Sequence, residues 1–335
     1  MKRSRTKESE IIDMVQSFTG KNPFLEQGIG DDGAIVKIGH GGKRIVITTD
    51  MLIEGTHFSL DWISYFELGQ KAYQVNASDL AAMGSKPYMA LISIGTGKDA
   101  DLRDVREFYR GFTRSSARDN CILAGGDTVR AFRLSISITL TGIYERGARA
   151  LLRSGAKPGH RVYITGYPGE SGMGLFLLQN AASRYSGLKR HPLVKRHLIP
   201  EARLKEGILL SKSVSTGGVI DISDGVFNDA KHIARMSKVR LIIDKSRLPL
   251  SPTLKRESDH ANLNPMDFVL FGGEDYELLF TSRSPLKQIR RMFQRHDIST
   301  AVHEIGRVEK GKGVVLMDER SMPVKVIDKT FQHFL

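Results

Sequence analysis

The sequence predicts an α/β fold divided between two domains. Its 335 residues are more than one hydrophobic core usually serves, and 40% hydrophobic with 26% charged residues is typical of a globular protein. Patterns typical of helices and of strands alternate along the whole chain. A passage rich in turn-forming residues, from Arg146-Gly147 to Pro158-Gly159, separates the two halves. We therefore place the domain boundary near residue 150, which gives domains of residues 1–150 and 151–335.

The first half alternates between helix and strand signals. Ile11, Met14, Val15 and Phe18 recur at helical spacing. Strands are predicted for residues 34–38, 44–49 and 121–124, and helices for residues 68–83 and 102–112. The strand at 121–124 is expected to lead into a Gly125-Gly126-Asp127 turn.

Residues 134–141 alternate strictly between apolar and hydroxyl-bearing side chains. Leu134, Ile136, Ile138 and Leu140 would share one face of a strand, and the Ser and Thr residues between them would share the other. Such a strand is buried on one side only. This pattern is typical of an antiparallel or mixed sheet.

The second half is also α/β in pattern. Strands are predicted for residues 161–165, 219–222 and 239–243. Helices are predicted for residues 171–182 and 201–213 and for the segment after Gly225. A loop from Pro249 to Pro252 precedes the last strands.

The distribution of apolar residues along the chain indicates where in the cell the protein is located. No apolar run approaches the roughly 20 residues that a bilayer span requires. The start, Met1-Lys2-Arg3-Ser4-Arg5-Thr6, lacks the apolar stretch of a signal peptide. We therefore expect a cytoplasmic protein without a membrane partner. The single Cys121 is followed by apolar residues, which favours a buried strand residue over a nucleophile.

The formal net charge of +13 raises the question of a nucleic-acid partner. The Lys and Arg clusters lack interleaved aromatic residues, and the chain carries no zinc-finger or RNP-like signature. A solvated basic surface explains the charge, and nucleic acid is not expected as a partner.

Five short acidic motifs place aspartate beside Gly, Ser or Thr. They are Gly30-Asp31-Asp32-Gly33, Thr48-Thr49-Asp50, Ser78-Asp79, Gly125-Gly126-Asp127-Thr128 and Asp221-Ile222-Ser223-Asp224-Gly225. Carboxylate oxygens suit a hard cation that bridges to phosphate oxygens, and no His or Cys cluster has the spacing of a zinc site. In a basic chain, the motifs indicate a Mg²⁺ and polyphosphate site assembled from several loops.

The glycine-rich stretches do not indicate a common nucleotide-binding loop. Gly28, Gly30 and Gly33 spell G-x-G-x-x-G, but a dinucleotide site requires a strand before this motif and a helix after it, whereas a strand pattern follows here. A metal-binding turn and an ordinary Asp-Gly turn remain as alternatives. No stretch completes G-x-x-x-x-G-K-[ST], which excludes a P-loop kinase.

Several candidate residues also have purely structural explanations. His57, which follows the Thr48-Thr49-Asp50 motif, could equally be a surface or core histidine. The carboxylate of Asp79 could be satisfied by a cation or by an ordinary salt bridge. Ser223 and Asp224 could simply cap the following helix. The acidic stretch 272–277 could contact a ligand or form a tight bend.

In their order and spacing, these motifs resemble the thiamine-monophosphate kinase family. The resemblance rests on the five motifs, on His57-Phe58, on the stretch 76–84 and on Gly273-Glu274-Asp275-Tyr276-Glu277-Leu278. It extends to Phe331-Gln332-His333-Phe334, which looks like the family's aromatic-x-His-Phe ending. Each motif alone is weak, but together they are specific and span nearly the whole chain.

The resemblance implies the two-domain α/β (α+β) fold of the aminoimidazole ribonucleotide synthetase superfamily. The N-terminal domain would bind ATP and Mg²⁺ and pair across a homodimer, and the C-terminal domain would close the active-site cleft. The implied reaction is ATP-dependent phosphorylation of thiamine monophosphate to thiamine diphosphate, assisted by several Mg²⁺ ions.

Residue roles follow from the same resemblance, position by position. The implied metal ligands are Asp31, Asp32, Thr48, Thr49, Asp50, Asp79, Asp127 and Asp221, with Asp224 holding a further cation. The implied ATP contacts are Tyr109, Gly126, Asp127, Arg153 and Ser223. The residues implied to face the thiamine moiety are His57, Glu274 and Phe331. No covalent catalytic residue is expected, because the acceptor phosphate can attack the γ-phosphorus in line.

The chain departs from the family pattern at Gly33, at Gly172-Met173 and at Ala202. The alternatives are a sibling synthetase of the same superfamily or a nucleotide-binding protein without catalysis. Selenophosphate synthesis and hydrogenase maturation typically use a cysteine near one terminus, and Cys121 occupies neither place.

Overall fold

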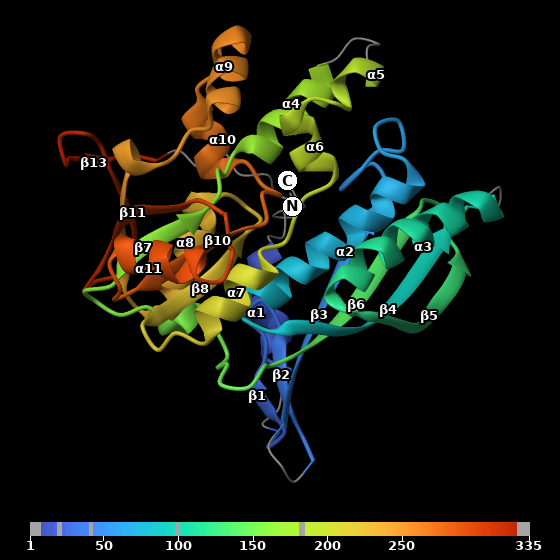
Figure 1. The fold of residues 1–335 in the computed structure, drawn as a ribbon, viewed down its shortest axis with the longest axis horizontal. Coiled ribbons are helices and arrows are strands. Elements are labelled where there is room, and N and C mark those ends of the chain that lie inside the picture. The colour runs from blue at the N-terminus through green and yellow to red at the C-terminus, as the bar shows by residue number, and fades with distance from the viewer. Residues whose placement is uncertain (1–7, 19–21, 40–42, 98–100, 181–184, 327–335) are drawn as a thin grey trace, which may run out of the picture.

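Two β-sheets form the framework of the protein (Figure 1). The computed structural model describes residues 8–18, 22–39, 43–97, 101–180 and 185–326. Within these residues, the strands form a six-stranded sheet in the first half and a seven-stranded sheet in the second. The connection between the sheets runs from the end of β6 (Ser135–Ile143) to the start of β7 (Arg161–Thr165), and residue 150 lies on it.

The first sheet is mixed and has the strand order β1-β2-β3-β6-β4-β5. Strands β4 and β5 pair in parallel and are joined by α3 (Leu102–Ser116), whereas β6 pairs antiparallel with both β3 and β4. Ile136, Ile138 and Leu140 of β6 are buried, which confirms the half-buried strand predicted there. The other strands are β1 (Leu25–Gln27), β2 (Ala34–Ile38), β3 (Lys43–Ile53), β4 (Lys86–Thr96) and β5 (Ile122–Arg130).

Helices α2 (Tyr65–Ala82) and α3 (Leu102–Ser116) lie together along one side of this sheet (Figure 1). A capping box fixes the start of α2, because the Ser64 hydroxyl accepts from the Glu67 N–H while the Glu67 carboxylate accepts from the Ser64 N–H. The two helices touch through glycines. A Cβ added at Gly111 would lie 1.8 Å from the Phe66 carbonyl oxygen.

The opposite face of the sheet carries exposed apolar side chains. By strand register, the odd-numbered residues of β3 and β4 share this face with Ile122 and Val129 of β5. Met51 is 54% exposed and Leu91 40%, and the nine residues of β5 are exposed or half-buried throughout. Monomeric proteins rarely leave such a face uncovered.

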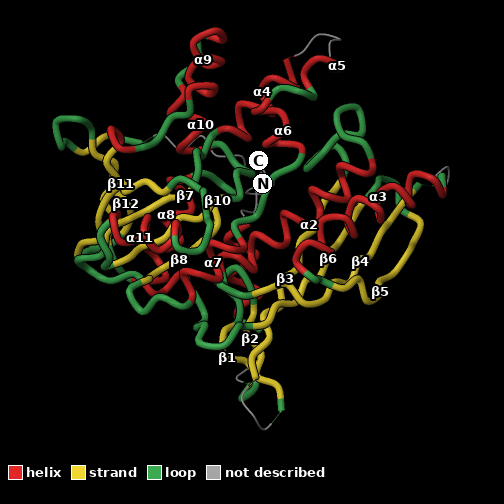
Figure 2. Tube along the Cα trace, in the orientation of Figure 1, coloured by secondary structure: helices red, strands yellow, loops and turns green. Residues whose placement is uncertain are grey.

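The second sheet has the strand order β13-β12-β9-β11-β7-β10-β8 and is mainly antiparallel. In the view of Figure 2, α4 and α6 lie above the junction of the two sheets. Besides β7, the strands of the second sheet are β8 (Thr216–Ile222), β9 (Arg240–Asp244), β10 (Glu277–Ser282), β11 (Val302–Glu309), β12 (Gly313–Met317) and β13 (Pro323–Val324). The remaining helices are α1 (Glu8–Gln16), α4 (Glu170–Asn180), α5 (Tyr185–Leu188), α6 (Pro192–Leu198), α7 (Leu204–Ser211), α8 (Val226–Ser237), α9 (Pro252–Ala261), α10 (Pro265–Phe271) and α11 (Leu286–Gln294).

Helix α2 joins the two halves into one packed body. The largest cluster of buried apolar side chains includes Leu68 and Leu80 of α2 as well as Val219 and Phe280 of the second sheet. Close backbone packing supports the contact, since a Cβ at Gly207 of α7 would lie 2.0 Å from the Ala81 carbonyl oxygen. The two domains therefore share a core.

Two local expectations differ from the structure. The helix predicted for 201–213 begins only at Leu204 and ends at Ser211. The Gly125-Gly126-Asp127 segment is no turn but lies within β5. Its second glycine is needed for strand pairing, because a Cβ at Gly126 would lie 1.7 Å from the Ile92 carbonyl oxygen of β4.

Cys121 is 5% exposed directly before β5, so the predicted burial of its side chain is confirmed. Among the described helices, none combines the length and the apolar character needed to cross a membrane.

Candidate active site

Three aspartates from different parts of the chain meet between the two sheets. Asp32 precedes β2, Asp79 lies near the end of α2, and Asp221 lies near the end of β8. One carboxylate oxygen from each of the three lies within 4.8 Å of the others. Asp32 and Asp221 are 7% and 4% exposed and Asp79 is half-buried, so this carboxylate cluster is largely shielded from bulk water.

Neighbouring hydroxyl groups orient the cluster. The Thr48 hydroxyl donates to Asp79 Oδ2, and the Ser78 hydroxyl donates to Asp221 Oδ2 at 2.7 Å. Asp50 lies two residues after Thr48 on β3, so both side chains face the same side of the sheet. Strand β3 and helix α2 thus place further side-chain oxygen atoms, which could also bind a cation, next to the carboxylates of Asp32 and Asp221.

The cluster opposes its own ionisation. Burial, followed by the charge of Asp32, raises the pKa of Asp221 to about 7 and that of Asp50 to about 6. Burial and then the charges of Asp50 and Asp221 raise the pKa of Asp79 well above its ordinary value. A cation must therefore be close if all of these carboxyls are to be anions at neutral pH.

The donor set fits a hard divalent cation. Asp32 Oδ2 is buried without a hydrogen-bond partner in the described structure, as expected for an atom that is complete only with a ligand. The surrounding donors are all oxygens, which Mg²⁺ prefers. Asp32, Asp79 and Asp221 would hold such an ion, with Asp50 and Thr48 beside them.

Arg153 is the cationic side chain in contact with this cluster. Its Nε atom lies 3.2 Å from Asp32 Oδ1. Its backbone N–H donates to Asp31 Oδ1 at 3.2 Å, so Asp31 is directed toward the 153–155 turn and Asp32 toward the cluster. Burial, followed by the charge of Asp32, raises the pKa of Asp31 to about 7.

The loop that carries Ser223 and Asp224 follows directly from Asp221. The Asp224 N–H donates to Asp229 Oδ2 at 3.2 Å, and the Ser223 carbonyl accepts from the Glu274 N–H at 2.9 Å. The residue that caps α8 is Gly225, without a side-chain cap, so the helix-capping alternative for Ser223 and Asp224 is wrong. Asp224 is exposed, in contrast to the buried cluster.

Glu274 lies on the loop before β10, in a left-handed backbone conformation with φ of +62°. Its Oε2 atom lies 3.2 Å from the Nζ of Lys71 and 3.3 Å from the Nδ1 of His197. Burial raises the pKa of Glu274, but the positive charge of the Lys71 ammonium is the foremost of the effects that bring it below its ordinary value overall. His57 is itself oriented by the Ile53 N–H, which donates to its Nδ1 at 3.1 Å.

The domain models for the AIR synthase related proteins match this chain twice. The N-terminal domain model matches residues 30–144 and the C-terminal domain model matches residues 157–319. Thiamine-monophosphate kinase of Aquifex aeolicus is 35% identical over 324 residues, covering 97% of either chain. The Bacillus subtilis enzyme of the same name is 32% identical, covering 98% of this chain and 99% of its own.

This chain belongs to the thiamine-monophosphate kinase family.

Solved structures agree with this assignment. The structure described as AaThiL complexed with AMPPCP and TMP covers 100% of both chains, with a TM-score of 0.83 and 33% identity. The thiamine-monophosphate kinase of Stenotrophomonas maltophilia covers 91% of this chain and 95% of its own, with a TM-score of 0.74 and 31% identity. Escherichia coli HypE, at 16% identity and a TM-score of 0.68, shares the fold.

Not every residue implied by the thiamine-monophosphate kinase motifs lies at the cluster. The exposed Thr49 side chain is on the opposite face of β3 from Thr48 and Asp50, and it donates to the Ile138 carbonyl oxygen. Gly126 and the exposed Asp127 lie on the edge strand β5. Tyr109 is half-buried on α3 and packs edge-to-face on Phe108. Phe331 lies outside the described residues.

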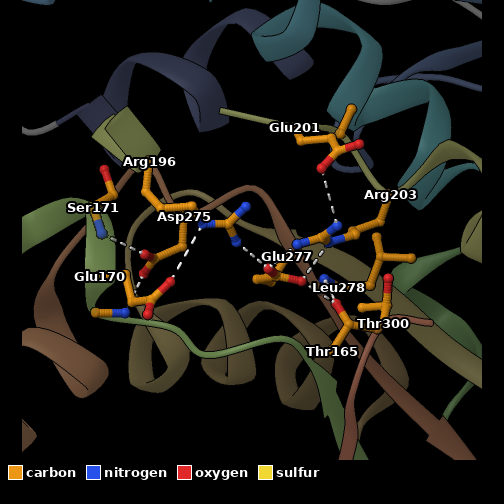
Figure 3. Close-up of polar contacts among 12 residues, drawn as sticks. Thr165, Glu170, Ser171, Arg196, Glu201, Arg203, Asp275, Glu277, Leu278 and Thr300 are labelled. Carbon is orange, nitrogen blue, oxygen red and sulfur yellow. Dashed lines mark hydrogen bonds and ion pairs between the residues drawn. The ribbon is translucent and has the colours of Figure 1, made fainter. Parts of the chain in front are cut away.

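A buried ion network beneath the Glu274 loop was not predicted. Glu277 is fully buried on β10, where its Oε2 accepts from Arg203 Nε at 2.7 Å and from the Thr165 hydroxyl at 2.6 Å (Figure 3). Arg196 contacts Glu277 Oε1, and Asp275 accepts from the N–H groups of Gly169 and Ser171 (Figure 3). The sequence indicates only that the 272–277 stretch is unusually acidic.

Lys71, His197, Ser78 and Asp229 were also missed. Lys71 and His197 carry no local motif, whereas Ser78 stands beside Asp79 in a motif that was recognised. Asp229 could have been found from the sequence, because an acidic residue in the first turn of a helix, here α8, is a recognisable pattern.

Proposed function

We propose that this protein transfers the γ-phosphoryl group of ATP to thiamine monophosphate, giving thiamine diphosphate and ADP. The observation that carries the proposal is the buried cluster of Asp32, Asp79 and Asp221, with an unpartnered oxygen in the described structure and Arg153 beside it. In the related structure that contains AMPPCP and TMP, both kinds of ligand are bound by a protein of similar fold.

The chemistry needs positioning and charge compensation more than proton transfer. An oxygen of the acceptor phosphate attacks the γ-phosphorus, and the bond from this phosphorus to the β–γ bridging oxygen breaks with its electron pair leaving on ADP. Because the attacking oxygen already belongs to an anion, no strong general base is required. Mg²⁺, when bound, would screen the repulsion between the two phosphate groups.

The chain's own residues divide this work. Asp32, Asp79 and Asp221, with Asp50 and Thr48, would hold the cations. Arg153 would add a fixed positive charge next to the phosphates, since its guanidinium reaches Asp32 Oδ1.

We assign the binding of ATP and Mg²⁺ to an N-terminal domain of residues 1–150. A C-terminal domain of residues 151–335 would lie over the cleft. Ser223 and Asp224 would contact ATP and a further cation from the second of these domains. His57 and Glu274 would face the thiamine moiety, because His57 acts electrostatically on Glu274 across the domain boundary and so lowers its pKa.

The test is ³¹P NMR of the purified protein with ATP, Mg²⁺ and thiamine monophosphate, beside a control without the acceptor. Thiamine diphosphate should appear in step with ADP, and an Asp79→Asn variant that retains its circular-dichroism spectrum should form neither. Intact ATP in the wild-type sample, or ATP hydrolysed without phosphorylation of the acceptor, would refute the proposal.

Asp127 supports a homodimer as the working form. It lies in register with Ser93, Ser137 and Met51, on the face opposite to Asp50 and Thr48. Three strand spacings separate β5 from β3, or about 14 Å. Asp127 therefore cannot join the carboxylate cluster of its own chain, but it can serve a second copy packed on the open apolar face of the sheet.

Mixed dimers test this arrangement. Asp127→Asn and Asp32→Asn should each abolish turnover alone. Co-expressed, they should recover about one quarter of wild-type activity, because half of randomly formed dimers are mixed and each mixed dimer has one intact site. No recovery from dimers that are shown to be mixed, or a monomeric mass in light scattering, would contradict the shared site.

A further inference from the structure

Helix α2 places a buried cation, Lys71, at the junction of the two domains. Its side chain is 1% exposed and lies two helical turns before Ser78, on the face of α2 that contacts the C-terminal domain. The Lys71 ammonium donates to Glu274 Oε2 at 3.2 Å and to the His197 carbonyl oxygen at 3.1 Å. A buried lysine is retained only with such partners.

Glu274 is held at one of its two oxygens. Lys71 and His197 both contact Oε2, so among the described residues Oε1 is left for a ligand, and the side chain remains 25% exposed. The backbone is fixed as well, because the Glu274 N–H donates to the Ser223 carbonyl in the loop beside the carboxylate cluster. The carboxylate thus has a defined position and one open face.

Lys71 supplies the positive charge in this group of three. Burial, followed by the charge of Lys71, lowers the pKa of His197 to about 3, so its imidazole is neutral at physiological pH. His197 can then donate or accept a hydrogen bond but adds no charge. In the described structure, Lys71 is the foremost of the groups that lower the pKa of Glu274 and so keep it ionised.

The segment that carries His197 is anchored independently of Glu274. Arg196, the residue before His197, and Arg203 both contact the buried Glu277 (Figure 3). The Ser171 hydroxyl lies 3.1 Å from His197 Nδ1. Removing the Lys71 ammonium therefore removes the charge next to Glu274 and one hydrogen bond to the His197 carbonyl, while the contacts of Arg196 and Ser171 still hold the segment.

We propose that Lys71 is a positioning residue for the acceptor: it holds Glu274 as an oriented anion whose second oxygen receives the positively charged, hydrogen-bond-donating organic part of a phosphate monoester. The inference rests on the proposed function, in which the thiazolium ring and the amino group of thiamine monophosphate provide that charge and those donors. The catalytic cations and ATP would lie on the carboxylate cluster instead, so Lys71 would act on the binding of one substrate only.

Steady-state kinetics of four variants test this role. Lys71→Met keeps the length of the side chain without its charge, and Glu274→Gln removes the charge of its partner. A double variant combines them, and Lys195→Met removes an exposed lysine from α6 as a matched control. Turnover by the wild type tests the proposed function. The ratios of the KM values for thiamine monophosphate among the variants test the positioning role of Lys71. Affinity for thiamine monophosphate by calorimetry gives the same ratios without turnover.

We expect Lys71→Met to raise the KM for thiamine monophosphate at least about tenfold, as for a buried charge that loses its partner, while the KM for ATP changes less than about twofold. The double variant should bind the acceptor no worse than Glu274→Gln, because Lys71 acts through Glu274. Lys195→Met should match the wild type.

Several results would overturn the inference. The first is an unchanged KM for thiamine monophosphate in folded Lys71→Met. The second is an equal rise of the KM values for thiamine monophosphate and for ATP. If Lys71→Met does not fold, the double variant, which buries no unpaired charge, decides the matter. A further tenfold loss of acceptor affinity in the double variant relative to Glu274→Gln would show that Lys71 does not act through Glu274.

Discussion

Asp221→Asn should make the protein more stable in the absence of Mg²⁺ while it abolishes turnover. Asp221 is 4% exposed, and burial together with the charge of Asp32 raises its pKa to about 7 from an ordinary value of 3.8. Below about pH 4 the carboxyl is protonated in both the folded and the unfolded chain. Between these two pKa values the folded chain binds more protons, so stability falls as the pH rises through this range.

The size of the effect follows from the shift. About three pKa units at about 1.36 kcal/mol each give a loss of up to about 4 kcal/mol at about pH 8 relative to about pH 4. An asparagine has no charge to lose, so the variant should exceed the metal-free wild type by up to this amount at the higher pH and match it at the lower. Ser78 can still donate to the side-chain oxygen of the asparagine, in place of the carboxylate oxygen that it now contacts at 2.7 Å.

Urea unfolding in EDTA at about pH 4, 6 and 8 measures the difference, and repetition with Mg²⁺ should favour the wild type. Asp13→Asn, an exposed residue of α1, serves as the control and should leave the pH profile unchanged. Equal stability of wild type and Asp221→Asn at the highest pH without metal would refute the view that carboxylate repulsion strains the folded site.

Two further changes test the framework of the site. Glu277→Gln should lower the free energy of unfolding by about 3–5 kcal/mol in urea, because Arg203 and Arg196 lose their buried anion. Glu309→Gln, at a side chain that is 41% exposed, is the control, and a loss below about 1 kcal/mol in Glu277→Gln would contradict the role of the network. Gly111→Ala should lower the free energy of unfolding by about 1–3 kcal/mol or more, because its Cβ would lie 1.8 Å from the Phe66 carbonyl oxygen. In the control Gly97→Ala, the added Cβ meets nothing within 4 Å. Equal unfolding midpoints for the two variants would disprove the close helix contact.

Local periodicity predicted the elements whose surroundings are regular. Strand β6 was found because Ile136, Ile138 and Leu140 all face the helices, so burial follows the two-residue period. Strand β4 was not predicted, although it lies in the interior of the first sheet. Its burial alternates, but Met89 and Leu91 are apolar although they lie on the open face, so the sequence lacks the apolar–polar alternation that would have revealed the strand.

The site was predictable where its residues stand in short motifs and not where distant segments meet. Asp32, Asp79 and Asp221 each lie in or beside such a motif, and the structure brings them together. Lys71 and Glu274 are 203 residues apart, and no pattern near either one indicates the other. Their pairing arises only when α2 is packed between the two sheets.

The shared core around α2 limits how the substrates can enter. In many two-domain enzymes a hinge opens the cleft, but here such a rotation would separate Leu80 from Val219 and expose apolar surface to water. It would also break the contacts of Lys71 with Glu274 and of Ser78 with Asp221. A hinge rotation between the two halves is therefore costly, and we expect the substrates to reach the site without one.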